Sequence, residues 1–461
     1  MNRSLQIGLL LAVTLHAFDE MALVIALPTI SKDLGGGEWY GVTLAAYVLA
    51  ALVSTVWSGD WLDRHGPSGV FRVALLAFAL GLGLAVVSDS MGVFVIARAL
   101  QGFGGGIAFT VAYSVTNRLC PEEHKSRMVA WLDSAWLLPS LLAPAVGGLL
   151  VEHWSWRGLF WLQMPLLGVL ALLLMKPLRG LERTPQSPNF NALWNALRIG
   201  GCCMLMVLVT STPLSPLWLL VPISALLLWR PLNRALPQQW WRMRTTLPLS
   251  LILHGGIFFV FYGLESFLPL YLIDARGMGV TATGLAFTGA AFTWVAASFL
   301  QSSSKINMTH RNSLLWGLGL FALAIGLMAL LLLPVAPTWT IYPAWAMAGF
   351  GMGLAYNAVA TAAMLATEPG KEGATATGTG LMDSIGIGLA VGIGGAIKNQ
   401  VGYQGGGLDL AMGLIGALML LVTLVSLWLI WRRFPQLNSS EIYRNQPLPI
   451  GREKTKTAIP F

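Results

Sequence analysis

Long apolar runs separated by short polar loops follow one another along almost the whole chain. A helix needs about 20 apolar residues to cross a bilayer, and these runs reach that length. The pattern therefore predicts an all-α membrane protein with many spans. Twelve of the runs form two sets of six, at residues 5–30, 40–60, 69–88, 92–118, 128–151 and 155–175, then 248–273, 281–304, 311–333, 339–366, 375–397 and 407–431.

A longer stretch with apolar segments of its own separates the two sets. Residues 192–211 and 214–230 are apolar and are joined by the turn-forming sequence STPLSP. They either cross the membrane as a hairpin, which gives 14 spans, or add no crossing. We expect four parts: an N-terminal six-helix bundle in residues 1–190, a linker with two extra membrane segments in 191–245, a C-terminal six-helix bundle in 246–435 and a cytoplasmic tail in 436–461.

The two sets of six spans repeat each other. Three short matches occur in collinear order at shifts of 247, 250 and 241 residues: GFGGGIAF at 102–109 with GFGMGLAY at 349–356, LDS at 132–134 with MDS at 382–384, and LP at 27–28 with LP at 268–269. The repeat predicts two homologous bundles related by a pseudo-twofold axis along the membrane normal, with a substrate site between them. Glycines in such helices allow close backbone approach.

Composition and charge narrow the class further. Of 461 residues, 56% are hydrophobic and only 10% are charged, against roughly 25% charged in soluble domains, which excludes an ordinary soluble enzyme. The net charge of +8 is spread over short loops, so it indicates topology and not nucleic-acid binding. With a cytoplasmic N-terminus, 23 of the 28 Lys and Arg are cytoplasmic, and the exceptions are Lys32, Arg98, Arg157, Arg276 and Lys398. We expect a cell (inner) membrane protein with both termini cytoplasmic and an uncleaved first span.

Motifs for common enzyme chemistry are missing from the sequence. It contains no G-x-x-x-x-G-K-[ST], no H-E-x-x-H and no G-x-S-x-G, which argues against an ATP-driven pump, a zinc protease and a serine esterase. Three cysteines, Cys120, Cys202 and Cys203, lack metal-ligand spacing. We therefore expect no enzymatic activity, no metal and no cofactor, and an ion gradient as the energy source.

A few charged residues fall inside the apolar runs, where an ionised side chain costs several kcal/mol unless it has a partner, a wet cavity or a proton. Asp19 and Glu20 lie near the middle of the first span and point about 100° apart, so we expect one of them to face the central cavity. Neighbouring carboxylates repel, which favours reversible proton binding. The alternative is that one simply pairs with Arg98 and holds the bundle together. The full set is Asp19, Glu20, Arg98, Asp133, Glu265 and Asp383.

Other residues within the spans allow a functional and a structural interpretation. Glu265 in the seventh span is deep enough to line the cavity and to bind a cationic substrate or a proton; alternatively, it stabilises the helix near Pro269. His16 and His254 lie in spans one and seven and could titrate near neutral pH, but a single histidine within a membrane span is more often a hydrogen-bonded structural residue. Three tryptophans lie inside spans: Trp57, Trp136 and Trp294. They either contact a lipophilic substrate or pack in the core.

Several motifs resemble signatures of the major facilitator superfamily. Residues 59–66, GDWLDRHG, resemble its G-x-x-x-D-R-x-G loop signature after span two, although Pro67 and Ser68 replace the usual basic residues. RALQG at 98–102 is similar to the R-x-x-Q-G signature of proton-coupled members. PSLLAPAVGG at 139–148 resembles the antiporter signature G-x-x-x-G-P-x-x-G-G, with Pro139 and Ala143 replacing glycines.

Two further stretches point to the drug:proton antiporter branch with about 14 spans. WSWRGLFWLQMPL resembles W-R-W-x-F-x-x-N-x-P, with Gln163 at the Asn position, and FDEMALVIALP resembles L-D-x-x-x-x-x-x-A-L-P, with Phe18 at the Leu position. The chain is identified as a member of that branch. The resemblance implies the major facilitator fold and proton-coupled export of lipophilic or cationic small molecules by alternating access. Proton coupling would involve Asp19, Glu20, Arg98 and Glu265.

The same resemblance implies a gate and a helix hinge. In the gate, Asp383 would exchange partners with the loop that contains Asp63 and Arg64. Alternatively, Asp133 and Asp383 lie near helix N-termini and stabilise them through the helix dipole. Gate residues would be Gly59, Asp63, Arg64, Gly66, Asp133 and Asp383, and hinge residues Pro139, Pro144, Gly147 and Gly148. The expected partners are a small substrate, protons and membrane lipids. Two rival functions are a lipid or amphiphile transporter and a non-transporting receptor or scaffold, against which the intramembrane charges argue.

Overall fold

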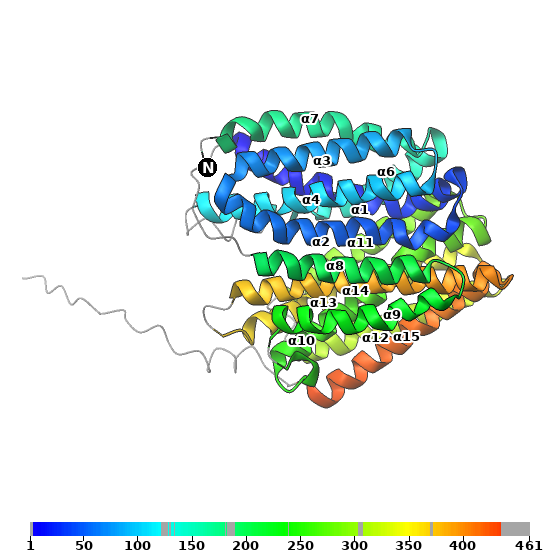
Figure 1. Cartoon of the computed structure of the whole chain (residues 1–461). Helices are drawn as coiled ribbons and strands as arrows, with labels where there is room; N and C mark the ends of the chain where they lie inside the picture. The colour runs from blue at the N-terminus through cyan, green and yellow to red at the C-terminus, as the bar shows by residue number, and fades with distance from the viewer. Residues whose placement is uncertain are drawn as a thin grey trace, which may run out of the picture.

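The protein is a bundle of long helices that run roughly side by side, as the computed structural model in Figure 1 shows. The structure describes residues 3–120, 128, 131–132, 134–179, 181, 190–237, 239–302, 308–368 and 372–434, and no strand occurs in these ranges. The helices are α1 (Arg3–Leu34), α2 (Tyr40–His65), α3 (Pro67–Val87), α4 (Met91–Leu119), α6 (Leu137–His153), α7 (Arg157–Arg179), α8 (Phe190–Thr210), α9 (Leu220–Ala235), α10 (Thr246–Leu270), α11 (Val280–Ser302), α12 (His310–Ala329), α13 (Ile341–Leu365), α14 (Glu372–Tyr403) and α15 (Leu408–Arg433).

All but one of the predicted membrane segments are confirmed as helices of membrane-crossing length. Within the described ranges, 13 helices are long and apolar enough to cross a bilayer, and α6 is a shorter apolar helix. Both segments of the linker are among the 13, which favours the hairpin and about 14 spans. The predicted fifth span, 128–151, overlaps α6, although residues 129–130 and 133 lie outside the described residues.

Glycine and proline end and start helices where the chain reverses. Gly66 has a φ of 75°, a left-handed value that favours glycine, and it follows the last residue of α2. Pro67 then occupies the first position of α3, where its missing N–H needs no partner. Gly66 alone thus joins α2 and α3 as two antiparallel helices, and Gly59 lies within the last turns of α2.

The internal repeat of the sequence is a repeat of close helix packing. A Cβ added at Gly102 of α4 would lie 2.1 Å from the backbone oxygen of Tyr47 in α2, and one added at Gly349 of α13 would lie 2.1 Å from that of Ala290 in α11. Gly104 and Gly351 approach α3 and α12 in the same way, at 2.7 and 2.6 Å from backbone oxygens. The duplicated glycines therefore place α4 and α13 centrally in equivalent half-bundles.

The two bundles meet along two pairs of helices, α6 with α11 and α2 with α14. We call the end of the molecule where α1 begins the near end and the opposite end, where α1 finishes, the far end (Figure 1). Toward the far end, Gly41 of α2 approaches Gly395 of α14, whose Cα is 3.1 Å from a Cβ added at Gly41. Hydrogen bonds join the bundles there too: Asn399 Nδ2 donates to the Glu38 oxygen at 2.8 Å, and Lys398 Nζ donates to that of Gly37.

The hairpin α8–α9 lies against the seam between the bundles. Helix α8 contacts α2 on one side and α14 on the other, and Figure 1 shows it running between them. Its contacts with α2 are apolar, such as Val53 against Gly200. At the far end, the turn that follows α8 is hydrogen-bonded to α14. Gln400 Nε2 donates to the Thr212 oxygen at 2.8 Å, and the Tyr403 hydroxyl donates to the Ser211 oxygen at 2.9 Å.

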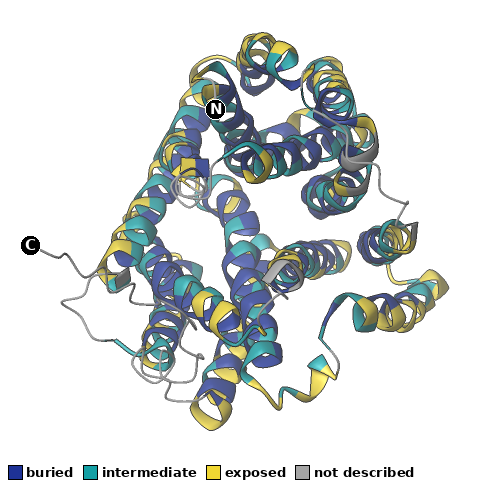
Figure 2. Cartoon of the chain, turned by 90° about the vertical axis from the view of Figure 1, so that its left-hand side faces the viewer, coloured by how far each residue is buried: buried dark blue, intermediate teal, exposed yellow. Residues whose placement is uncertain are grey.

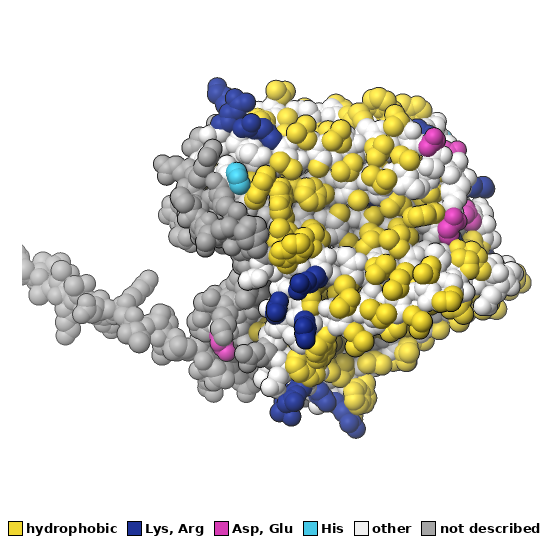
Figure 3. Space-filling view, viewed as in Figure 1, with side chains coloured by type: hydrophobic (Ala, Val, Ile, Leu, Met, Phe, Trp, Pro, Cys, Tyr) yellow, Lys and Arg dark blue, Asp and Glu magenta, His cyan; other side chains and the backbone are white. Residues whose placement is uncertain are grey.

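Charge and exposure agree with a molecule embedded in a membrane. Figure 2 shows the helices end-on, with buried residues facing one another and exposed residues mainly on the outside. The exposed large hydrophobic side chains are mainly leucines and tryptophans. On the face drawn in Figure 3, Lys and Arg gather mainly toward the near end and hydrophobic side chains cover the middle. This distribution is typical of a protein whose near end is cytoplasmic.

Candidate functional site

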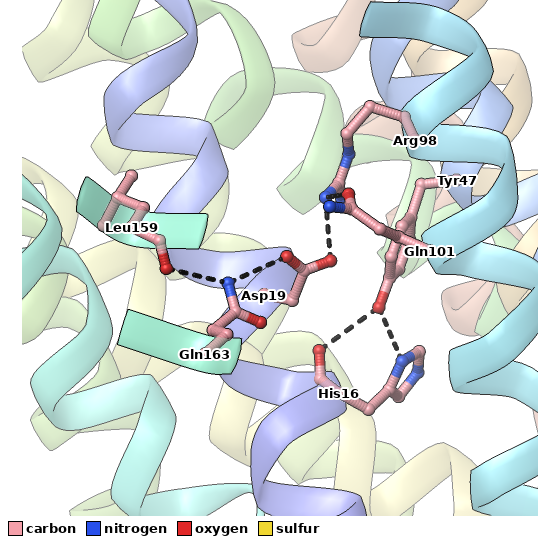
Figure 4. A network of polar contacts seen from close by, with 7 residues as sticks. All are labelled: His16, Asp19, Tyr47, Arg98, Gln101, Leu159 and Gln163. Atoms are coloured by element: carbon pink, nitrogen blue, oxygen red, sulfur yellow. Dashed lines mark hydrogen bonds and ion pairs between the residues drawn. The ribbon is translucent and has the colours of Figure 1, made fainter. Parts of the chain in front are cut away.

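A buried ion pair lies at the centre of the N-terminal bundle. Arg98 Nη1 of α4 donates to Asp19 Oδ2 of α1 at 2.7 Å, and both side chains are 1% exposed. The second oxygen of Asp19 accepts a hydrogen bond from Gln163 Nε2 of α7 at 3.1 Å, and Arg98 Nη1 also lies 2.5 Å from Gln101 Oε1 (Figure 4). Each carboxylate oxygen of Asp19 therefore has a donor, as a buried charge requires.

An aromatic and histidine layer supports this ion pair on the side of α2. The Arg98 guanidinium lies over the Tyr47 ring at 4.2 Å, and the Tyr47 hydroxyl lies 2.6 Å from His16 Nδ1. His16 in turn packs edge-on against Trp136, at 5.5 Å between ring centroids. Gly105 leaves room for His16, because a Cβ there would lie 2.4 Å from Nδ1. The network thus spans α1, α2, α4 and α7 (Figure 4).

A second polar site lies between the two bundles. Glu20 of α1 and Glu265 of α10 line one cavity of about 30 Å³, together with Arg98, Tyr47 and Tyr262. This volume is sufficient for water. Neither carboxylate has a hydrogen bond or ion pair in the part of the chain that the structure describes. The cavity therefore brings together one unpaired carboxylate from each bundle.

The adjacent residues Asp19 and Glu20 are separated by the helix, as their angular spacing predicts. Asp19 points into the N-terminal bundle toward Arg98, whereas Glu20 faces the cavity shared with Glu265. Three of the four residues predicted for proton coupling, namely Glu20, Arg98 and Glu265, line this cavity directly. Asp19 is linked to it through Arg98.

The predicted tryptophans contact other rings and do not line this cavity. Trp57 packs against Trp61 at 4.5 Å and Trp136 packs against His16. Trp294 packs edge-on against Phe261 at 5.6 Å in the C-terminal bundle. Their predicted contact with a substrate stays a prediction, and packing among aromatic rings is what the structure describes for them.

The predicted gate is only partly within the described residues. Asp133 lies outside the described residues, as do the side chains of Asp63 and Arg64. Asp383 of α14 lies 2.7 Å from His254 Nε2 of α10, within its own bundle. The predicted partner exchange of Asp383 with the α2–α3 loop stays a prediction.

The predicted hinge motif lies at the seam between α6 and α11. A Cβ added at Gly148 would lie 2.8 Å from the Thr281 Cα, and the Pro144 oxygen is 2.2 Å from a Cβ added at Gly284. Gly147 faces α1 at Ala22, and Pro139 is buried in the same helix. The motif therefore allows close backbone approach between the bundles.

Several residues of the site were not assigned a role from the sequence. Gln163 and Gln101 belong to stretches that resemble family motifs, and their motif positions were the available signal. Tyr47 and Tyr262 had none, because a tyrosine in an apolar run is compatible with either packing or a cavity wall. Their placement depends on which helix faces meet.

The comparisons with known proteins agree with this fold. The sequence profile of the Major Facilitator Superfamily matches residues 9–391, and the chain belongs to this superfamily. It is similar to a peptide transporter of the POT family, with a TM-score of 0.70 at 12% identity over 97% of this chain and 99% of that one. It is also similar to the xylose transporter XylE from E. coli, in a partially occluded inward open conformation, with a TM-score of 0.62 at 11% identity over 96% and 99% of the two chains. These likenesses show the shared fold.

Curated relatives carry names of efflux proteins. Multidrug resistance protein 3 of Bacillus subtilis is 24% identical over 411 residues, which cover 86% of this chain and 79% of the relative. The putative multidrug resistance protein MdtD of Escherichia coli is 30% identical over 209 residues, 44% of each chain. The multidrug efflux pump SdrM of Staphylococcus aureus is 27% identical over 169 residues, 37% of this chain and 38% of the relative. The chain is thus a multi-pass membrane transporter with multidrug efflux homologues.

Proposed function

We propose that the protein is a proton-coupled secondary transporter that exports lipophilic or cationic small molecules from the cytoplasm by alternating access. The observation that carries the proposal is the pair Glu20 and Glu265, one from each bundle, which share one cavity and have no hydrogen bond or ion pair among the described residues. The names of the multidrug resistance and efflux relatives support export as the direction.

The cavity suggests how substrate and protons exclude each other. Two ionised carboxylates in a low-dielectric cavity repel, and either a cation between them or a proton on one of them relieves the repulsion. Substrate would bind from the cytoplasm while Glu20 and Glu265 are ionised. Protonation from the outside would then remove the charge that holds the cation and release it. A bound proton lowers the affinity for the cation, and a bound cation lowers the affinity for the proton by the same factor. This reciprocal effect is the coupling free energy of an antiporter.

The ion pair of Asp19 with Arg98 supplies a connection between the two sites. Arg98 faces both Asp19 and the cavity, so the charge on Glu20 and Glu265 acts on the same guanidinium that holds α4 to α1. A proton or cation in the cavity would change the balance of charges around Arg98. We therefore assign Asp19 and Arg98 a coupling role, and we assign Glu20 and Glu265 the alternate binding of the cation and the proton.

The closed far end fits a state that opens toward the cytoplasm. Lys398 and Asn399 bind backbone oxygens of the N-terminal bundle there, and Tyr40 donates to the Ser266 oxygen at 3.0 Å. Alternating access would require these bonds to break as the far end opens. With the near end cytoplasmic, the described conformation would receive substrate from inside the cell.

The lipid-transport alternative requires an opening from the cavity into the bilayer. Helix α8 lies along one seam, between α2 and α14, and glycine contacts bring α6 and α11 together along the other. Both observations favour a small soluble or membrane-partitioned cation over a lipid. A scaffold would gain nothing from two unpaired carboxylates in a buried cavity.

The test is efflux of a fluorescent lipophilic cation from proteoliposomes under an imposed pH gradient. We expect gradient-driven efflux to be lost in Glu20→Gln/Glu265→Gln and in Asp19→Asn/Glu20→Gln. Asp89→Asn, an exposed acidic residue outside the cavity, is the control and should transport like the unmodified protein. Retention of pH-driven efflux in both double variants, with folded protein, would refute the proposal.

A further inference from the structure

The near end of the hairpin α8–α9 carries arginines that meet arginines of two other segments. Trp229 of α9 packs against Trp241 of the short helix η3 (Trp240–Arg242) at 4.9 Å between ring centroids, and Arg433 Nη1 of α15 donates to the Arg242 backbone oxygen at 3.3 Å. These contacts bring α9, η3 and the end of α15 together. We call the exposed arginines at this junction the near-end basic patch: Arg230, Arg234, Arg242, Arg244 and Arg433.

The patch has no acidic partner in the part of the chain that the structure describes. None of its arginines forms an ion pair there, and the hydrogen bonds of its side chains go to uncharged oxygens, those of Gln239 and of the Arg242 backbone. Figure 3 shows basic side chains gathered at the near end in the lower half of the view. Guanidinium groups without a carboxylate suit a phosphate group, which arginine binds through two parallel hydrogen bonds.

The side chains along α9 follow the order in which the parts of a phospholipid lie in a bilayer. Leu226 and Leu227 are 75% and 60% exposed, Trp229 comes next at 45%, and the exposed Arg230 follows directly. Apolar side chains contact acyl chains, tryptophan lies at the interface, and arginine reaches the phosphate. A dissolved anion would use only the last of these contacts. The order therefore favours a lipid as the ligand.

The loop between α9 and α10 holds its arginines in place. Gln239 and Met243, on either side of η3, have φ values of 56° and 47°, in the left-handed region that non-glycine residues rarely adopt. Between them, Trp240 Nε1 donates to Asn233 Oδ1 of α9 at 2.9 Å. These constraints keep Arg242 beside α9 without a ligand, so that little order has to be gained on binding.

We propose that the near-end basic patch binds an anionic phospholipid of the near-end leaflet, with the phosphate among the arginines and the glycerol region against Trp229 and Trp241. The phosphate would join α9 to α15. It would hold the near end of the hairpin to the C-terminal bundle, as hydrogen bonds from Gln400 and Tyr403 hold its far end. This site is independent of the proposed function, because it lies outside the central cavity and needs no transport.

Lipid binding to the purified full chain in detergent tests the site. The chain is titrated with phosphatidylglycerol or phosphatidylcholine, native mass spectrometry counts the retained lipid, and thermal unfolding measures stabilisation. We expect one phosphatidylglycerol to bind about tenfold more tightly than phosphatidylcholine and to raise the melting temperature. Arg230→Gln/Arg234→Gln should weaken this binding about tenfold and abolish the stabilisation, because two charges of the patch are removed.

A matched control removes two charges from the near end of the other bundle. Lys176→Gln/Arg179→Gln changes two exposed residues in the last turn of α7 and should bind phosphatidylglycerol like the unmodified protein. Trp229→Leu keeps every charge and should weaken binding several-fold, which provides a second test if the arginine variant does not fold. Inorganic phosphate at the same concentration should neither stabilise the protein nor displace the lipid.

Three results would overturn the site. Equal weakening in Arg230→Gln/Arg234→Gln and Lys176→Gln/Arg179→Gln would show that only the overall positive charge attracts the lipid. Equal affinity for phosphatidylglycerol and phosphatidylcholine would exclude recognition of the negative charge. Stabilisation by inorganic phosphate alone would exclude a lipid-specific site. All three would leave the proposed function intact, because none of them concerns Glu20 or Glu265.

Discussion

The two bundles share a backbone framework and differ in what it encloses. At the shift of 247 residues that relates the glycine motifs, Arg98 of α4 corresponds to Trp345 of α13, and both are fully buried. At the shift of 241 residues in α1 and α10, Asp19 corresponds to Val260. The N-terminal bundle therefore holds an ion pair at the two positions where the C-terminal bundle has Trp345 and Val260, and Trp345 stacks on the neighbouring Phe261 at 5.1 Å.

This difference shows which buried groups the helix packing requires and which it does not. The C-terminal bundle demonstrates that an apolar filling satisfies the same helix packing. Replacing a buried ion pair by well-packed apolar residues is often neutral or stabilising. The charges of Asp19 and Arg98 are therefore unnecessary for the fold, which is why we assign them to coupling.

The largest effect should follow from breaking the ion pair on one side. Arg98→Leu leaves Asp19 buried with only Gln163 as a donor, so we expect a loss of about 3–5 kcal/mol in the free energy of unfolding and complete loss of proton-driven transport. Asp19→Val/Arg98→Leu, which makes both positions apolar as they are in the C-terminal bundle, should recover most of the stability and none of the transport. Thermal unfolding in detergent and proteoliposome efflux measure the two. Recovery of transport in the double variant would contradict the coupling role.

The equivalent change in the C-terminal bundle should affect stability alone. Trp345→Ala leaves a cavity against Phe261 and Phe287, and we expect a loss of about 3–5 kcal/mol. The pH dependence of the remaining transport should be that of the unmodified protein, because no charge has changed. An altered pH profile of transport, measured per folded molecule, would show that Trp345 contributes to proton coupling as well as to stability.

The shared framework should respond equally in both bundles. Gly102→Ala and Gly349→Ala each place a methyl group 2.1 Å from a backbone oxygen, so we expect both to lose at least about 1–3 kcal/mol. Gly83→Ala and Gly319→Ala, with no atom within 4 Å of the added Cβ, are the controls and should be neutral or stabilising by up to about 1 kcal/mol. Unequal losses at Gly102 and Gly349 would argue against equivalent packing.

The smallest effect is expected at the contact between the bundles. Asn399→Ala removes a donor to the Glu38 oxygen, a hydrogen bond worth about 0.5–1.5 kcal/mol, and a longer hydrogen bond to the Ser211 oxygen at 3.3 Å. Because the bond to the Glu38 oxygen exists only while the far end is closed, we expect faster labelling of far-end cysteine probes and an unchanged melting temperature. Gln404→Ala, beyond the end of α14, is the control for a general change at this end. Unchanged labelling in Asn399→Ala would contradict a role in closure.

Much of the fold could be predicted from the sequence because a bilayer imposes a single length scale on apolar runs. The span boundaries, the two linker segments and the repeat of 102–109 in 349–356 follow from that scale and from glycine spacing. The separation of Asp19 from Glu20 followed from the helical angle between neighbours.

The partners across helices could not be predicted in the same way. The sequence gives no rotation for α10 relative to α14, so the 2.7 Å contact of His254 with Asp383 had no signal. Glu20 and Glu265 meet because α1 and α10 face each other across the bundle interface, and that depends on how whole bundles dock. Tyr47 and Tyr262 were missed for the same reason.

The turn at Gly35 to Glu38 has an evolutionary consequence. Its backbone oxygens accept hydrogen bonds from Lys398 and Asn399, so these two bonds depend on the path of the backbone there. Gly35 and Gly36 hold that path with φ values of 65° and 76°. Substitutions at Glu38 that preserve the turn would keep both hydrogen bonds and change only the charge beside Lys398, so selection would act mainly on the backbone path of the turn.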